Sequence, residues 1–365
     1  GSYITTDNGY TWDQYTMISG STLEMNIAEE SDGEYTIYAG NYNGIKVFSS
    51  SEATWTDYTD PGTFGREVKA LMSDPAMPGM VMIAKRDALN SGLMFRSTDS
   101  GGGFTELARS QTTPGTMFAT TWYETAAAEL LKSDDFGESW TVIDGNDNNH
   151  HAMTDVVVAY NNDDILYTFG DGLVAKTEDG GDSWTQVSDG LPSFAGIYDG
   201  SISPFSSDML LISSDAGTYK SIDGGVSWYL IHDSDCKVVE FNSVLPGIAV
   251  MVTFANEVLI SYDNGETWQA FDGNISADYT DVVYSPNGST VYISTTSQGI
   301  YTTELDLAYV SPSAVTTTVN AFNVTITWNA VDLASGYHVY RGEELVGVTT
   351  ADELSYMDFY VLPGE

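Results

Sequence analysis

The chain repeats one pattern of apolar and polar positions along most of its length. An alternating run, such as GTYKS at 217–221 or VLISY at 258–262, leads into a short turn rich in Asp and Gly, and a second alternating run follows, such as SWTVI at 139–143. Alternation with a period of two on both sides of a tight turn predicts a β-hairpin. Two more such runs precede each hairpin, for example TDVVVAY at 154–160 and DILYTF at 164–169. Each unit is therefore predicted to hold four strands.

The turns between these runs share the motif Ser/Thr-x-Asp-x-Gly-x-Ser/Thr-Trp. Six copies begin at residues 5, 97, 133, 177, 221 and 261, and a degenerate copy, FSSSEATW at 48–55, fills the gap between the first two. Self-similarity at intervals of about 40 residues indicates a repeat architecture. The residues that define the motif are Asp7, Gly9, Trp12, Asp99, Gly101, Asp135, Gly137, Trp140, Asp179, Gly181, Trp184, Asp223, Gly225, Trp228, Asp263, Gly265 and Trp268.

The residue types of the motif fit a structural role. An Asp carboxylate accepts N–H bonds within its own loop, and Gly adopts a positive φ that a Cβ would penalise. The Trp is expected to pack between neighbouring sheets. We therefore predict that the motif maintains the fold and takes no direct part in chemistry.

Four strands in each unit of about 40–45 residues is the spacing of propeller blades. With these turns, residues 1–308 resemble the Asp-box (BNR) repeat β-propellers found in sialidases, xyloglucanase-type glycosidases, sortilin-type receptors and photosystem assembly factors. The resemblance implies a radial ring of sheets. It also implies that ligands bind where the innermost strands begin, at one mouth of the central channel, while the Asp-box hairpins lie on the outer, opposite side.

The number of blades follows from how the repeat region starts and ends. It begins with a third-strand run, SYITT, and its turn, and it ends with another third-strand run, GIYTTE at 299–304. We predict a seven-bladed ring in which a strand at about 11–18 completes the last blade, leaving no open sheet edge. This arrangement gives residues 1–6 no obvious place. An eight-bladed ring is the alternative.

Residues 309–365 show a different pattern and form a second predicted domain. TITW, which ends at Trp328, and YHVYR at 337–341 resemble strands B and C of a fibronectin type III domain, an Ig-like β-sandwich. The resemblance stops before strands F and G. A sandwich without them would expose its core and an unpaired edge. Either the chain is a fragment of a longer polypeptide, or a neighbour, such as another copy of the protein, supplies the missing strands.

The charge balance limits the partners of the protein. The chain has 12 Lys and Arg residues against 52 Asp and Glu residues, a formal net charge of −40. Phosphate binding needs clustered Lys and Arg, so nucleic acid is excluded. The charge indicates a salty or calcium-containing exterior, where cations screen carboxylates; solubility alone is the other explanation. Cys236 is the single cysteine, and no apolar run is long enough to span a bilayer. We expect an extracellular or cell-surface location.

Three acidic residues occupy the same position at the start of predicted innermost strands: Asp155, Asp199 and Asp281. Such residues would place carboxylates around one mouth of the channel. Two interpretations are open. The ring holds a cation or hydrogen-bonds a sugar, or each Asp caps its own loop.

A second acidic segment resembles a calcium loop. Asp144, Asn146 and Asn148 follow the D-x-N-x-N start of such a loop, but the Gly at the sixth position and the Glu at the twelfth are missing. An exposed turn and a Ca²⁺ site are the two alternatives. No other cofactor is indicated.

The chain lacks most of the catalytic features of the enzyme families that it resembles. A sialidase needs three arginines converging on a carboxylate and an Arg-Ile-Pro motif, but the predicted propeller has four arginines, all within two adjacent units, at positions 66, 86, 96 and 109, and no such motif. Xyloglucanase-type enzymes use two carboxylates between tandem propellers, and one propeller is predicted here. No catalytic residue is assigned.

These observations favour a protein of extracellular recognition, adhesion or assembly. Its partner would be a glycan or a protein, and copies of the chain joined through the incomplete sandwich would build a surface filament or layer. The alternative is a polysaccharide-active glycoside hydrolase with its site at the central channel mouth.

Overall fold

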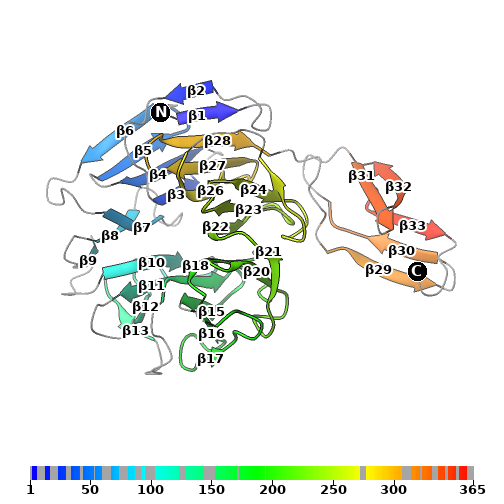
Figure 1. Cartoon of the computed structure of the whole chain (residues 1–365), viewed down its shortest axis with the longest axis horizontal. Helices are drawn as coiled ribbons and strands as arrows, with labels where there is room; N and C mark the ends of the chain where they lie inside the picture. Colours follow the sequence, from blue (N-terminus) through cyan, green and yellow to red (C-terminus); the bar gives the residue numbers. More distant parts are fainter. Residues whose placement is uncertain are drawn as a thin grey trace.

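The computed structural model describes residues 2–5, 13–16, 24–29, 34–41, 44–52, 54–59, 67–73, 81–86, 92–94, 103–122, 129–143, 153–170, 172–193, 195–271, 277–305, 312, 314–320, 323–330, 336–341, 344–350 and 353–359. Every regular element in these ranges is a β-strand, which confirms the predicted all-β class. No candidate membrane-spanning helix occurs in this described part. The strands form a larger lobe and a smaller C-terminal lobe (Figure 1).

The described residues of the larger lobe form seven sheets. Five of them follow the chain in order from the inner to the outer strand: β3–β6 (Glu24–Glu29, Tyr35–Asn41, Gly44–Ser49, Thr54–Thr59), β10–β13 (Gly103–Arg109, Met117–Trp122, Leu130–Ser133, Thr141–Val142), β14–β17 (Asp155–Ala159, Asn162–Gly170, Leu173–Thr177, Thr185–Gln186), β18–β21 (Ile197–Ile202, Leu210–Ser214, Gly217–Ser221, Tyr229–His232) and β22–β25 (Cys236–Phe241, Ala249–Thr253, Val258–Ser261, Gln269–Ala270). A sixth sheet has three described strands, β7–β9 (Glu67–Ser73, Val81–Arg86, Gly92–Met94).

The seventh sheet joins the two ends of the repeat region. Its strands β26 (Tyr279–Tyr284), β27 (Thr290–Thr295) and β28 (Ile300–Glu304) are extended by β1 (Ser2–Thr5) and β2 (Asp13–Thr16). β1 pairs with β28 in parallel and with β2 in antiparallel orientation. The strand β1, for whose residues the sequence predicted no position, therefore lies between β2 and β28, the two strands that were expected to pair. The extra strand covers the edge of β28 that would otherwise be unpaired.

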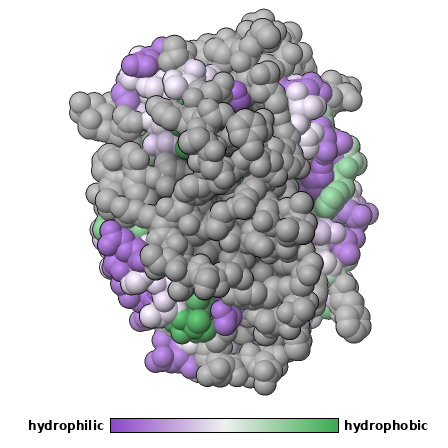
Figure 2. Space-filling model, turned by 90° about the vertical axis from the view of Figure 1, so that its left-hand side faces the viewer, coloured by the Kyte–Doolittle hydropathy of each residue, from purple (hydrophilic) through white to green (hydrophobic). Residues whose placement is uncertain are grey.

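The first strands of the seven sheets are neighbours in one cyclic order. β3 lies against β7, β7 against β10, and the series continues through β14, β18, β22 and β26, which packs back on β3. Figure 1 labels six of these strands, all but β14, toward the middle of the larger lobe. The face shown in Figure 2 is largely hydrophilic among its described residues, with small hydrophobic groups between them. The hydrophobic side chains are instead concentrated between the sheets.

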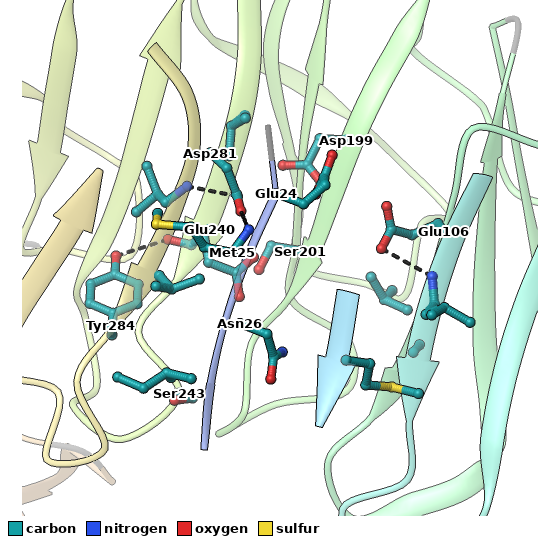
Figure 3. Close-up of a pocket in the computed structure, with 18 of the residues that line it drawn as sticks. Glu24, Met25, Asn26, Glu106, Asp199, Ser201, Glu240, Ser243, Asp281 and Tyr284 are labelled. Atoms are coloured by element: carbon teal, nitrogen blue, oxygen red, sulfur yellow. Dashed lines mark hydrogen bonds between the residues drawn. The ribbon is translucent and has the colours of Figure 1, made fainter. Parts of the chain in front are cut away.

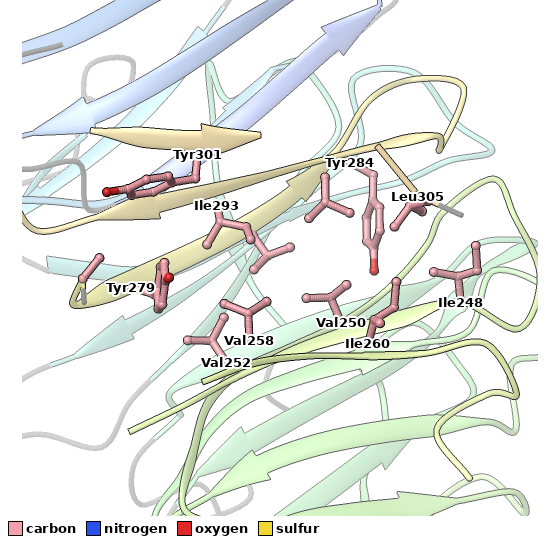
Figure 4. Close-up of a cluster of buried hydrophobic side chains, with 13 residues drawn as sticks. Ile248, Val250, Val252, Val258, Ile260, Tyr279, Tyr284, Ile293, Tyr301 and Leu305 are labelled. Atoms are coloured by element: carbon pink, nitrogen blue, oxygen red, sulfur yellow. The ribbon is translucent and has the colours of Figure 1, made fainter. Parts of the chain in front are cut away.

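The core consists of layers between neighbouring sheets. One layer packs β22–β24 against β26–β28 (Figure 4), and in it Val250, Val252 and Val291 are completely buried. Successive side chains of a strand point to opposite faces of its sheet, so each sheet presents apolar side chains to the sheet on either side of it. The tyrosines Tyr279 and Tyr301 stack edge to face in the same layer, with ring centroids 6.3 Å apart.

The smaller lobe has two sheets. β29 (Thr316–Asn320), β30 (Asn323–Thr327) and β33 (Ser355–Phe359) form the first, and β31 (Gly336–Arg341) and β32 (Glu344–Thr350) form the second. Trp328 follows β30 and is buried against Tyr337 of β31, with ring centroids 5.3 Å apart at 61°. This aromatic contact is the centre of the lobe's small core.

Candidate ligand-binding cavity

The aspartate of each described Asp-box turn is held by hydrogen bonds from its own turn. Asp223 Oδ1 accepts the amide of Ser227 at 2.8 Å, and Oδ2 accepts the Ser227 hydroxyl at 2.5 Å. The Ser221 hydroxyl donates to Asp223 Oδ1 at 2.9 Å and accepts the amide of Gly225 at 2.8 Å. Equivalent bonds surround Asp135, Asp179 and Asp263.

The glycine and the tryptophan of the turn connect it to the preceding sheet. Gly225 has φ 85°, and a Cβ there would lie 2.8 Å from Val187 Cγ2. Trp228 is buried, and its Nε1–H donates to the Val187 carbonyl at 2.8 Å. Trp184 makes the same kind of bond to the sheet before its own.

The other turn residues occupy related places. Positive φ angles also occur at Gly137, Gly181 and Gly265. Trp140 packs against the cluster that holds Met72 and Met82, and Trp268 packs against the cluster around Phe241. The remaining predicted motif residues lie outside the described residues: Asp7, Gly9, Trp12, Asp99 and Gly101.

The proposed calcium loop also lies outside the described residues, at Asp144, Asn146 and Asn148. Within the ranges that the structure describes, no group of three or more His, Cys, Asp or Glu side chains is placed to hold a metal ion.

A cavity of about 830 Å³ lies among the inner strands, and all seven of these strands contribute to its lining. Its wall carries six carboxylate residues together with Asn26, Ser201 and Tyr284, several of which Figure 3 shows around the same space. The six are Glu24, Glu106, Asp155, Asp199, Glu240 and Asp281. The structure thus brings the three aspartates predicted at the inner-strand starts together with three glutamates that sequence reasoning missed.

Five of these carboxylates occupy one equivalent position on their strands. The strands β7, β10, β18 and β22 each contain a register irregularity near their start. It lies immediately before Ala70, Glu106, Asp199 and Val238, so these four residues occupy equivalent positions. In the remaining inner strands, β3, β14 and β26, the equivalent residues are Glu24, Asp155 and Asp281, as the hydrogen bonds between neighbouring inner strands show. Glu240 follows Val238 by two residues and therefore lies on the same side of β22.

The three aspartates of the wall bridge neighbouring inner strands. Asp155 Oδ2 accepts the amide of Gly200 at 2.7 Å, and Asp199 Oδ2 accepts the amide of Val239 at 2.8 Å. Asp281 Oδ2 accepts the amide of Met25 at 2.7 Å, which connects the last inner strand to the first. In each pair the amide belongs to the next strand of the cycle. The aspartates therefore do more than cap their own loops: they link sheets.

Polar side chains two residues further along add to these links. Asn26 Oδ1 accepts the amide of Ser73 at 3.0 Å, and Ser201 Oγ accepts the amide of Phe241 at 3.0 Å. Glu106 differs, because its Oε1 accepts the amide of Leu107 in its own strand at 3.0 Å. The cavity wall thus contains both bridging groups and carboxylates with other partners.

Burial raises the pKa values of five of the six wall carboxyl groups. It raises the pKa of Asp155 and of Asp281 to about 7, against the opposing effect of the amides that bond to them. Burial, with the charges of Asp155 and Asp281, raises the pKa of Glu240 to about 8. The pKa values of Glu106 and Asp199 are also well above the ordinary range, for the same reason of burial. Near neutral pH the cavity therefore holds carboxyl groups that can donate hydrogen bonds as well as accept them.

Comparison with known proteins places the fold. No family model matches the chain, and neither does a curated protein sequence. Among solved structures, the GH74 xyloglucanase from Xanthomonas campestris is similar with TM-score 0.60 at 13% identity, covering 88% of this chain and 60% of that one. The GH74 enzyme of Niastella koreensis has TM-score 0.58 at 15% identity, covering 86% and 58%. YCF48, solved bound to D1 peptide, has TM-score 0.55 at 11% identity, covering 77% and 92%.

These neighbours define the class: the protein has a β-propeller fold. At such identities the similarity shows the fold alone. The chain spans about 60% of the length of the two GH74 structures.

Proposed function

We propose that this protein is an extracellular recognition protein that binds a glycan in the carboxylate-lined cavity of its propeller. The observation that carries the proposal is the cavity wall itself, in which carboxyl groups at one equivalent position on five strands face a space of about 830 Å³. A hydroxyl-rich ligand needs both donors and acceptors. Carboxyl groups whose pKa values lie near 7 or 8 supply both at neutral pH.

The proposal includes a seven-bladed ring and a fibronectin type III module. Support for seven blades comes from the seven sheets, the cyclic order of their first strands, and the bond between Asp281 and Met25 that joins last to first. Support for the module comes from the two sheets of the smaller lobe and the burial of Trp328 between them. The net charge of −40 and the appended module support a place outside the cell or on its surface.

Binding to an immobilised glycan array, at pH 7 with and without calcium, tests the proposal. We expect a defined set of glycans to bind, and Glu106→Ala to weaken that binding about tenfold because a hydrogen-bonding carboxyl group is removed from the wall. Glu106 is preferred over Asp155 or Asp281 for this test, because the latter two hold strands together. The matched control is Glu178→Ala, at an exposed carboxylate of an Asp-box turn. An array without any bound glycan would reject the proposal.

A glycoside hydrolase is the second candidate. Glu240 favours it, because its pKa of about 8 keeps the carboxyl protonated at neutral pH, which a general acid requires, and ionisable carboxyl groups line the same cavity. The similarity in fold to two GH74 enzymes fits this candidate as well.

Release of reducing ends from a polysaccharide panel distinguishes the two functions. Hydrolysis that falls at least about a hundredfold in Glu240→Gln would establish the enzyme. Binding without release of products would favour recognition.

A further inference from the structure

Two exposed aromatic rings are in contact, and one of them lines the cavity. Tyr198 of β18 is 43% exposed and lines the cavity, and Phe254, in the turn after β23, is 47% exposed. Their ring centroids are 5.1 Å apart at an angle of 59°. The pair spans two neighbouring sheets, since β18 and β23 belong to different ones. Large apolar rings usually leave water when a protein folds, so two adjacent exposed rings, one of which lines a cavity, indicate a binding surface.

Several polar contacts hold this pair of rings in place. The Lys237 ammonium lies 5.3 Å from the centroid of the Phe254 ring, and it donates to Asp278 Oδ1 at 2.5 Å and to Asn256 Oδ1 at 3.1 Å. The amide of Phe254 donates to the Asp235 carbonyl at 2.9 Å. A surface that is already ordered loses little conformational entropy when a ligand binds.

The two rings and the cavity wall beside them differ in chemistry. Asp199 directly follows Tyr198 in β18, and Glu240 lies on β22, the next inner strand. A ligand that covers the rings would therefore present an apolar face to Tyr198 and Phe254 and polar groups to the carboxyl groups. A pyranose ring has this character, with C–H groups on its face and hydroxyl groups at its edge.

We propose that Tyr198 and Phe254 form a stacking platform for a neutral pyranose of the glycan. This inference rests on the proposed function and specifies its ligand. The charge of the cavity sets the class. Six carboxylate residues line it against two cations, Arg109 and Lys237, and Lys237 is already paired with Asp278. Asp155 and Asp281, with pKa values of about 7, are partly ionised at neutral pH, and a sugar acid would add like charge to them. The site therefore selects neutral sugars against uronic acids and other acidic sugars.

Isothermal titration calorimetry with cellohexaose, mannohexaose and hexagalacturonate tests the platform. We expect at least one neutral hexasaccharide to bind and the acidic one to bind at least about tenfold more weakly. Tyr198→Ala and Phe254→Ala should each raise the Kd of the neutral probe about tenfold or more, while Tyr198→Phe, which keeps the ring, should stay within about twofold.

Phe205→Ala is the matched control. Phe205 is 50% exposed and follows β18 at its opposite end, away from Tyr198. Its loss should leave the Kd unchanged, and an unchanged melting temperature in each variant shows that the fold persists. Neutral-sugar binding that survives both alanine substitutions would overturn the platform and leave the proposed function standing. Preferred binding of hexagalacturonate would overturn the neutral class. Absence of binding by all three probes, together with a blank array, would reject both proposals.

Discussion

The Asp-box turns and the cavity wall use the same residue type in opposite environments. Hydrogen bonds from the Ser139 hydroxyl and amide lower the pKa of the partly exposed Asp135 to about 2, whereas burial raises the pKa of Asp155 to about 7. Asp135 takes its bonds from residues within four positions along the chain, while Asp155 takes one from a strand 45 residues away. A turn aspartate thus stabilises one loop, and a wall aspartate connects two sheets.

The largest effect is expected at the tryptophan that joins a turn to the preceding sheet. Trp228→Ala should lower the free energy of unfolding by about 4 kcal/mol, because it removes a buried ring and its bond to Val187. Trp228→Phe keeps most of the ring and should cost clearly less. Urea unfolding followed by far-UV circular dichroism measures both. Equal losses in the two variants would contradict a packing role for the indole.

A somewhat smaller loss of stability is expected at the aspartates of the cavity wall. Asp281→Ala should lower the free energy of unfolding by about 3 kcal/mol, because the buried amide of Met25 loses its acceptor at the junction of the last and first inner strands. Asp281→Asn retains an oxygen acceptor and should keep most of that stability. Urea unfolding again provides the comparison. An unchanged midpoint in Asp281→Ala would show that this bridge does not hold the ring closed.

A smaller loss of stability is expected at the turn glycine. Gly225→Ala places a Cβ in a left-handed backbone and against Val187, so we expect a loss of about 2 kcal/mol. Gly196→Ala is the control, because its Cβ would meet the exposed side chain of Asp215. A melting temperature of Gly225→Ala equal to that of the control would contradict the close approach of turn and sheet.

The two regions should also respond oppositely to pH. The wall carboxyl groups have raised pKa values, so the folded state binds their protons more tightly, and their contribution to stability is lost as the pH rises from about 4 to about 8, by at most about 1.4 kcal/mol per pH unit for each group. The turn aspartates have lowered pKa values, and their contribution is lost as the pH falls from about 4 to about 2.

The melting temperature as a function of pH tests this difference. It should decline between pH 5 and pH 8, and Glu240→Gln should flatten that decline. A melting temperature that rises steadily over this range would contradict the burial of the wall carboxyl groups.

Features that depend on residues close together along the chain could be predicted from the sequence. The all-β class and the strand pattern follow from alternation and from turn residues, whose bonds, as around Asp223, lie within four positions along the chain. Asp155, Asp199 and Asp281 could be aligned because each stands at the start of a predicted innermost strand, in DVVV, DGSI and DVVY. Glu24 and Glu106 carry the same signal in EMNIA and ELAR, but their acidic residue is Glu in a less regular context.

Other features depend on partners that are distant in the chain. Glu240 is displaced by two residues from the aligned position, so only the register of β22 places it in the wall. The bond from Met25 to Asp281 spans 256 residues, and the parallel pairing of β1 with β28 joins the two ends of the repeat region. Local patterns contain no information about such pairs.

The amides of Met25, Gly200 and Val239 offer the most direct test of the cavity as the ligand site, because each donates to a wall aspartate. Their ¹H–¹⁵N resonances can be followed by TROSY NMR while a glycan that binds on the array is added. A ligand in the cavity should shift all three signals in proportion to saturation and leave the amide of Ser227, in an Asp-box turn, unchanged. Shifts confined to Ser227 and the other turns, or to the smaller lobe, would contradict it.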